Sequence, residues 1–283
     1  MIFNCGNFQL DLSQPKVMGI VNVTPDSFSD GGKYSQTNLA IAHALMLVQE
    51  GATILDIGGE STRPNATPVS LQQELDRVIP VIETLVKQVN TPISIDTYKP
   101  AVMQAAIRAG ASMVNDVRAL QEGAGLKQSA IEVVANANVG VCLMHMQGTP
   151  QTMQNNPQYN DVVSDVKAFL EARLQASIDG GCRASNILLD PGFGFGKTRE
   201  HNITLLQNLE SFADLGQPLL VGLSRKSVLG QIITGQMTGN DVDARLYASI
   251  AASVIAAMKG AKILRVHDVK ATVEALKVVS AIQ

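Results

Sequence analysis

Polar and charged side chains recur at one kind of position in this sequence, directly after a short run of apolar residues. The groups at these positions are Asn22, Asp56, Asp96, Asn115, His145, Asp190, Lys226, Arg265 and His267. Each of them costs free energy to bury unless a partner satisfies it. A single one has an ordinary explanation as a turn or helix cap, but their recurrence indicates a site assembled from several strand ends.

The mixture of groups suggests the kind of ligand. Asp96 and Asp190 offer carboxylate acceptors, Asn115 an amide that both donates and accepts, and Lys226 an ammonium donor. Such a set matches the edge of a flat nitrogen heterocycle that carries alternating N–H and C=O groups. The sequence therefore predicts a pocket for a polar, planar ring.

Further positive charge comes from Arg63, Arg265 and His267, and guanidinium groups in particular suit phosphate oxygens. No HxxxH motif or Cys/His cluster exists that would hold a metal ion by protein ligands alone. A Mg²⁺ ion bound by one oxygen, such as the Asn22 amide, with waters and substrate phosphates completing its shell, is compatible with the sequence.

Two motifs suggest other chemistry. Gly192-Phe-Gly-Phe-Gly-Lys-Thr198 looks like a nucleotide P-loop, but the spacing requires glycine where Pro191 stands. We expect these glycines to let the backbone approach a ligand, with Phe193 or Phe195 packing against it. Lys226 as a Schiff-base lysine, as in barrel aldolases, is an alternative that leaves the heterocycle-matching groups unexplained.

Short apolar runs and longer segments with helical periodicity alternate along the chain. We predict strands at 17–23, 54–58, 92–97, 113–117, 140–145, 187–190, 219–224 and 263–267. We predict helices at 38–50, 71–89, 100–109, 124–136, 161–179, 200–210, 243–259 and 269–281. Ser70 with Gln73 fits a capping box, and Gly51, Gly110 and Gly260 fit helix ends.

Eight strand–helix units in about 265 residues indicate a TIM (β/α)₈ barrel, which we expect to be a single domain over residues 1–283. A doubly wound sheet is the alternative, but it usually has fewer strands, and no strand–GxGxxG–helix unit is present. Residues 1–16 contain two extended pieces joined by Gly6-Asn7, which predict a β-hairpin at one end of the fold.

Composition limits the partners. The formal net charge of −3 provides no basic patch for nucleic acid. We expect no membrane association, because no apolar stretch is long enough to span a bilayer and residues 1–12 lack the regions of a signal peptide. The 3 cysteines have no CxxC spacing, which favours a reduced, cytoplasmic enzyme.

Two loops are longer and more polar than a minimal strand-to-helix turn needs. One runs from Asp26 to Gly32 and the other from Gly58 to Pro64. We expect them to act as lids over a substrate.

Five segments together resemble the dihydropteroate synthases. They are Asn22–Gly32, Gly58–Pro64, Asp190–Lys197, Ser224–Ser227 and Arg265–His267, and the resemblance extends from about residue 8 to the C-terminus. It implies a TIM barrel, usually a homodimer. The implied reaction joins p-aminobenzoate to 6-hydroxymethyl-7,8-dihydropterin diphosphate, with Mg²⁺, and gives 7,8-dihydropteroate and pyrophosphate.

The resemblance also implies roles for individual residues. The pterin is expected against Asp96, Asn115, Met144, Asp190 and Lys226. The diphosphate is expected against Asn22, Arg63, Arg265 and His267, with Asn22 also binding Mg²⁺. The p-aminobenzoate is expected between Phe28, Pro64, Phe195 and Ser227, and the residues expected to act in catalysis are Asp30, Arg63 and Lys226. Asp30 would stabilise developing positive charge.

Two other functions fit part of the pattern. A barrel methyltransferase acting on methyltetrahydrofolate would share the Asp/Asn set but has no use for two polar loops or for cations facing a diphosphate. A non-catalytic pterin-binding homologue is the second alternative. Release of pyrophosphate from pterin diphosphate and p-aminobenzoate distinguishes the three.

Overall fold

The computed structural model describes residues 1–24, 33–63, 66–123, 128–235 and 243–282. Eight parallel strands close into a barrel in the order β10-β3-β4-β5-β6-β7-β8-β9. They are β3 Lys16–Asn22, β4 Ile54–Gly58, β5 Ile93–Asp96, β6 Met113–Asp116, β7 Gly140–Met144, β8 Ile187–Asp190, β9 Leu219–Val221 and β10 Ala261–Val266. The predicted TIM barrel is confirmed.

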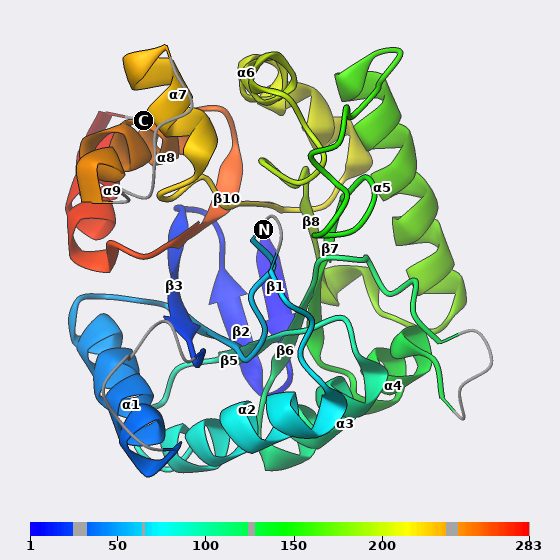
Figure 1. The fold of residues 1–283 in the computed structure, drawn as a ribbon, viewed down its shortest axis with the longest axis vertical. Helices are drawn as coiled ribbons and strands as arrows, with labels where there is room; N and C mark the ends of the chain where they lie inside the picture. Colours follow the sequence, from blue (N-terminus) through cyan, green and yellow to red (C-terminus); the bar gives the residue numbers. More distant parts are fainter. Residues whose placement is uncertain (25–32, 64–65, 124–127, 236–242, 283) are drawn as a thin grey trace.

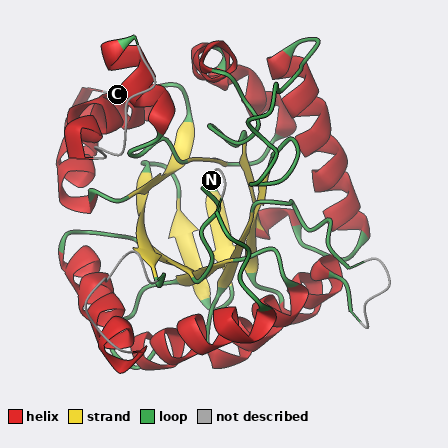
Figure 2. Ribbon diagram, viewed as in Figure 1, coloured by secondary structure: helices red, strands yellow, loops and turns green. Residues whose placement is uncertain are grey.

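Helices form an outer ring around the strands (Figure 2). They are α1 Lys33–Gln49, α2 Leu71–Leu85, α3 Pro100–Ala109, α4 Ala130–Ala137, α5 Val162–Asp179, α6 Arg199–Gln207, α7 Ser227–Thr234, α8 Leu246–Met258 and α9 Val269–Ile282. Among the described helices, none combines the length and the hydropathy that crossing a membrane requires.

Helix ends follow the local signals in the sequence. Ser70 forms the predicted capping box with Gln73 at the start of α2. Gly51, Gly110 and Gly260 adopt left-handed φ angles of 103°, 112° and 94°, so each allows the chain to leave a helix and enter the next strand. A similar box, Ser129 with Glu132, begins α4 later than the predicted residue 124.

The prediction missed α7 entirely. This helix has only 8 residues. It precedes α8 in the connection from β9 to β10, for which the sequence predicted a single helix. Other helices differ from the predicted bounds at one end. The helix α1 begins at Lys33 rather than at residue 38, α2 ends at Leu85 rather than at residue 89, α6 ends at Gln207 rather than at residue 210, and α8 begins at Leu246 rather than at residue 243.

An antiparallel hairpin of β1 (Ile2–Cys5) and β2 (Phe8–Asp11) lies across one end of the barrel, at the centre of Figure 1. Phe3, Cys5 and Leu12 pack against side chains from the amino-terminal half of the barrel strands, including Met18 and Ile54. The hairpin therefore closes the barrel end opposite to the one where the strands finish. The three cysteines are free and buried.

Alternation along each strand separates the side chains into two sets. One set, with Val17, Leu55 and Ile95, packs outward against the helices. The other set fills the interior of the barrel, and its lowest layer joins the hairpin in an apolar cluster. Further along the strands the same alternation places polar residues inside the barrel, which is where the candidate site lies.

Candidate active site

The strand register brings the polar residues side by side at the carboxyl ends. Gly58 of β4 lies opposite Asp96 of β5, and Asp96 lies opposite Asn115 of β6. Across β7 and β8, Met144 lies opposite Asp190. Residues from strands far apart in the sequence thus line one end of the barrel, as the sequence predicted.

Arg265 links two of these strand ends. Its Nε donates to Asp56 Oδ2 at 2.6 Å and its Nη2 donates to Asp96 Oδ2 at 2.7 Å. Asn115 Nδ2 also donates to Asp56 Oδ2, at 3.0 Å. Burial raises the pKa of Asp96 to about 7, although the Arg265 charge opposes the shift.

Asp56 is the centre of this network. It is fully buried, and its second carboxylate oxygen has no hydrogen-bonding partner. Asp56 was recognised as a strand-end group from the sequence but was not expected to line the site. The signal that identifies it is its place two residues before Gly58, on the same face of β4.

Asp190 and Lys226 form the second half of the polar end. Asp190 Oδ1 accepts the Gly192 N–H at 2.7 Å, and burial raises the pKa of this carboxyl while the Lys226 charge opposes it. Burial lowers the pKa of Lys226 to about 8, and Asp190 opposes that shift. The Lys226 ammonium donates to the Phe193 carbonyl oxygen and lies 4.5 Å from the centre of the Phe195 ring.

The turn after β8 is stiffened by a buried lysine rather than shaped to hold a nucleotide. Lys197 is 3% exposed, and its Nζ contacts His145 Nδ1 at 2.8 Å and the Gly192 and Phe195 carbonyl oxygens at 3.0 and 3.1 Å. A Cβ on Gly192, whose φ is +71°, would lie 1.8 Å from the His145 carbonyl oxygen. Only glycine fits there, so the turn needs it for packing.

Phe193 and Phe195 have different surroundings in that turn. Phe193 is fully buried in the core between barrel and helices, whereas Phe195 is partly exposed beside Lys226. Of the two rings that the sequence offered, Phe195 is the one that a ligand can reach.

His267 and Ser224 connect the ends of β10 and β9. The Ser224 hydroxyl lies 3.1 Å from His267 Nδ1 and accepts the His267 N–H at 3.1 Å. Burial first, and then the Arg265 charge, lower the pKa of His267 to about 3. The imidazole is neutral at pH 7, so it offers a hydrogen bond rather than the positive charge expected from the sequence.

Asn22 ends β3 beside Gly58. A Cβ on Gly58 would lie 3.8 Å from Asn22 Oδ1 and 3.7 Å from Asp96 Oδ2, so both oxygens face the same small space. Within the described part of the chain, the Asn22 amide makes no hydrogen bond. Its oxygen is available to a ligand or a metal ion.

The structure brings most of the predicted residues together. Asp96, Asn115, Asp190, Lys226 and Arg265 are joined by hydrogen bonds or by electrostatic interactions at the barrel end. Arg63 is exposed, and its charge contributes to the low pKa of His267. Ser227 is exposed at the first turn of α7. Three expected residues, Phe28, Asp30 and Pro64, lie outside the described residues.

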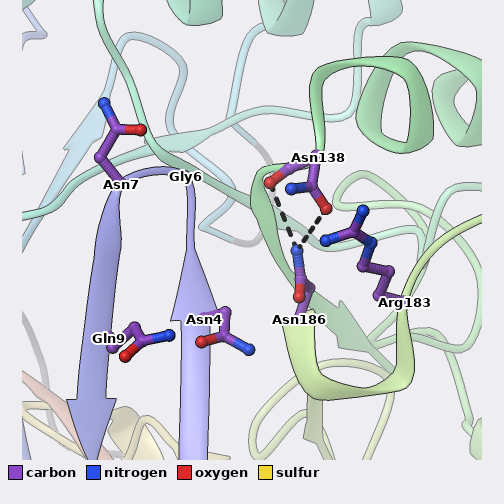
Figure 3. Close-up of a pocket in the computed structure, with 7 residues that line it drawn as sticks. All are labelled: Asn4, Gly6, Asn7, Gln9, Asn138, Arg183 and Asn186. Atoms are coloured by element: carbon purple, nitrogen blue, oxygen red, sulfur yellow. Dashed lines mark hydrogen bonds between the residues drawn. The ribbon is translucent and has the colours of Figure 1, made fainter.

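A separate polar cavity of about 430 Å³ lies near the hairpin, at the other end of the barrel (Figure 3). Its lining consists of carboxamide side chains, Gly6 and one guanidinium, and it includes Asn4, Asn138, Arg183 and Asn186. None of the strand-end groups described above lines it. The cavity is therefore distinct from the candidate site.

A family model described as pterin binding enzyme matches residues 18–267, a stretch that begins in β3 and ends at His267. The barrel and the ring of carboxylates, amide and ammonium at its carboxyl end agree with that match. Fold and site together define a TIM-barrel enzyme of the pterin-binding class.

Individual relatives are more specific. The dihydropteroate synthase of Escherichia coli K12 is 49% identical over 272 residues, covering 96% of this chain and 93% of the relative. That of Neisseria meningitidis serogroup C is 50% identical over 280 residues, covering 98% and 95%. This chain belongs to the dihydropteroate synthase family.

Solved structures agree. Xanthomonas albilineans dihydropteroate synthase with 4-aminobenzoic acid superposes with a TM-score of 0.91 at 50% identity, covering 100% of this chain and 98% of the other. The same enzyme in complex with 7,8-dihydropteroate superposes with a TM-score of 0.88 at 47% identity, covering 100% and 99%.

Proposed function

We propose that this chain joins p-aminobenzoate to 6-hydroxymethyl-7,8-dihydropterin diphosphate, and that the polar barrel end binds the pterin. The observation that carries the proposal is the arrangement of Asp96, Asn115, Asp190 and Lys226 at the carboxyl end of the barrel. Hydrogen bonds through Asp56 and Arg265 connect Asp96 with Asn115, and Asp190 interacts electrostatically with Lys226. Solved relatives with 4-aminobenzoic acid and with 7,8-dihydropteroate support it.

The pterin would bind to polar atoms that the hydrogen bonds within the site leave available. Asp190 has one oxygen engaged by the Gly192 N–H, which leaves the other for ring N–H groups. Asn115 uses its amide nitrogen on Asp56, so its oxygen is available. Met144 is 4% exposed and supplies an apolar side to the pocket. Donors and acceptors on both sides fix the orientation of the ring.

The diphosphate would lie above the pterin, near Asn22, Arg63, Arg265 and His267. Arg265 uses its Nε–H and one Nη2 hydrogen on Asp56 and Asp96, which leaves the Nη1 hydrogens and the second Nη2 hydrogen for phosphate. The neutral His267 can donate its Nε2–H when Ser224 donates to Nδ1. These donors stabilise charge on the departing oxygens.

Asn22 fits a role in holding Mg²⁺. Its amide oxygen makes no hydrogen bond to any residue that the structure describes, and it lies close to an Asp96 oxygen. Mg²⁺ commonly keeps its waters while using one or two protein oxygens. Among the described residues, no group of three or more His, Cys, Asp or Glu side chains is placed to hold a metal ion. When bound, the ion would neutralise the diphosphate as it leaves.

The missed helix α7 supports the predicted site for p-aminobenzoate. Ser227 is its first residue, and the residue at its N-cap, Lys226, makes no side-chain capping hydrogen bond. Such a helix start attracts a carboxylate. Phe195 stands beside Lys226 as an aromatic surface. The aryl amine would then face the pterin methylene.

Bond formation needs no protein nucleophile in this scheme. The C–O bond to the diphosphate breaks, the pterin ring delocalises the resulting positive charge, and the amine nitrogen forms the new C–N bond and loses a proton. Asp30 is proposed to stabilise the cation, and Arg63 and Lys226 to hold the reacting groups. Exclusion of water would keep the cation from hydrolysis.

We also propose that the enzyme is a homodimer. The helices α7, α8 and α9 lie side by side in Figure 1 and carry exposed apolar side chains. These include Ile232 and Ile233 at 47% and 57% exposure, Tyr247 at 82% and Met258 at 53%. Sedimentation analysis of the wild type and of Ile233→Glu tests this, and a monomeric wild type would exclude it.

The reaction itself is tested by pyrophosphate release. Release that needs pterin diphosphate, p-aminobenzoate and Mg²⁺ supports the proposal. Methyl transfer from methyltetrahydrofolate without pyrophosphate would support a barrel methyltransferase, and binding without turnover would support a non-catalytic homologue.

A further inference from the structure

A partly buried ionic cluster of Lys99, Glu60 and Glu74 lies beside the Gly58–Pro64 segment and includes none of the proposed pterin ligands. Lys99 Nζ lies 2.6 Å from Glu60 Oε2 and 2.5 Å from Glu74 Oε2, and it donates to the Val69 carbonyl oxygen at 2.8 Å. All three ammonium hydrogens are therefore used. Glu60 Oε1 in turn accepts the Val69 N–H at 3.1 Å.

This cluster joins the two ends of the segment that carries Arg63. Glu60 precedes Arg63 in the chain and Val69 follows it, and one ammonium holds both. The start of the segment, at Gly59, also contacts α2. Arg77 of α2 donates to the Gly59 carbonyl oxygen at 2.7 Å, and a Cβ on Gly59 would meet a side chain of α2 at 2.7 Å. The described parts of the segment are thus anchored on two sides.

The arrangement is costly for stability alone. Two carboxylates share one ammonium, Glu74 is fully buried, and its Oε1 has no partner. An uncompensated buried carboxylate oxygen costs free energy that an apolar side chain would not. Burial opposes protonation of Lys99, but the hydrogen bonds to Glu60 and Glu74 raise its pKa above the ordinary value, so the ammonium stays charged. A cost of this kind indicates a role beyond folding.

Lys99 also belongs to the strand end that supplies Asp96. It is the residue before α3, and the strand β5 ends at Asp96, three residues earlier in the chain. A short stretch of backbone therefore carries both Asp96, a proposed pterin ligand, and Lys99, which holds the segment that contains Arg63. Arg63 in turn is near enough to His267 to affect its titration.

We propose that Lys99, Glu60 and Glu74 are positioning residues that fix Arg63 relative to the pterin pocket, so that the aryl substrate is held for attack. This inference rests on the proposed function. It assigns the cluster to the use of p-aminobenzoate rather than to the binding of the pterin.

The test uses Lys99→Met, which removes the ammonium but keeps the aliphatic chain. We expect kcat/KM for p-aminobenzoate to fall at least about tenfold, because small displacements of a positioning group have large kinetic effects. The Kd for the pterin without its diphosphate, measured by calorimetry with 6-hydroxymethyl-7,8-dihydropterin, should stay within about twofold. Lys99→Arg, which keeps charge and donors, should recover most of the loss. Lys167→Met, which breaks the distant Lys167–Asp214 ion pair, is the matched control and should have normal kinetics.

A double-mutant cycle with Arg63→Ala separates positioning from general stability. If Lys99 acts through Arg63, Lys99→Met causes little further loss in the Arg63→Ala background. Fully additive losses, a parallel loss of pterin affinity, or normal kinetics of Lys99→Met would each overturn the inference. If Lys99→Met does not fold, Glu60→Gln is tested by the same cycle. If the wild-type enzyme releases no pyrophosphate, the proposed function is refuted instead. Failure of the proposed function is thereby distinguished from failure of the positioning role.

Discussion

Arg265 Nε lies 2.6 Å from Oδ2 of Asp56, a fully buried carboxylate whose Oδ1 has no partner. The same Asp56 oxygen accepts the Asn115 amide. One residue therefore organises a guanidinium and an amide that come from opposite parts of the chain. Because Asp96 shares the guanidinium, the position of the proposed pterin ligands depends on Asp56.

Asp56→Ala is expected to destabilise the protein, because it leaves the buried Asn115 amide without its acceptor and removes one of the two carboxylates that pair with the partly buried Arg265 guanidinium. Loss of one partner from a buried ion pair costs about 3–5 kcal/mol. Thermal unfolding should show a midpoint several degrees lower, with a smaller shift in Asp56→Asn. A midpoint of Asp56→Ala equal to that of the wild type would show that the network does not support the barrel end.

Asp190→Ala is expected to weaken pterin binding about 100-fold, since ring N–H donors left without an acceptor cost about 1–3 kcal/mol each. Calorimetry with a pterin ligand measures this directly. Asp214→Ala, on an exposed residue, serves as the control and should bind normally. Unchanged affinity in Asp190→Ala would remove this carboxylate from the pocket.

Lys226 should impose an alkaline limit on activity. Its folded-state pKa of about 8 lies below the usual 10.5, so the ammonium is present below about pH 8 and is lost above it. We expect kcat/KM for pterin diphosphate to fall about tenfold per pH unit above that value. Lys226→Arg, which stays charged, should be slower at pH 7 but should lack this decline. Identical profiles for the two enzymes would exclude Lys226 as the titrating group.

His145 should destabilise the folded state in acid. Its folded pKa of about 3, caused by burial and then by the Lys197 charge, lies below the ordinary value of 6.5. Between pH 3 and pH 6.5 the imidazole binds more protons in the unfolded chain than in the folded one. The stability that the neutral His145 contributes is therefore complete above about pH 6.5 and is lost as the pH falls. At pH 5 the loss is about 2 kcal/mol.

The variant His145→Gln isolates that contribution. Its amide oxygen can still accept from Lys197, but it does not titrate. As the pH is lowered from 7 to 5, the thermal unfolding midpoint of the variant should rise relative to that of the wild type. Parallel midpoints over that range would contradict the assignment. The comparison between variants matters because Asp96 and Asp116, whose burial raises their pKa values to about 7 and 6, act in the opposite direction.

Much of the fold could be predicted because local signals agree with the final arrangement. The capping box at Ser70 and the left-handed glycines at residues 51, 110 and 260 mark where helices begin and end. Alternation along β6 places Asn115 inside the barrel, where it donates to Asp56, whereas the Asp116 carboxylate accepts the Arg118 and Leu120 N–H groups.

What could not be predicted depends on contacts between distant residues. The helix α7 is too short for its periodicity to be recognised. The neutrality of His267 follows from burial and from neighbouring cations that only the folded chain brings close. The cluster of Lys99, Glu60 and Glu74 joins three segments of the chain. In the sequence, each of these residues has the pattern of an ordinary charged surface residue.

The most direct measurement is the identification of the product by mass spectrometry. Purified enzyme is incubated with pterin diphosphate, Mg²⁺ and isotopically labelled p-aminobenzoate, and each component is omitted in turn. We predict that labelled 7,8-dihydropteroate forms in equal amount to pyrophosphate, only when both substrates are present, and that Asp190→Ala forms far less. Pyrophosphate release without incorporation of the label, or no turnover of the wild type, would contradict the account.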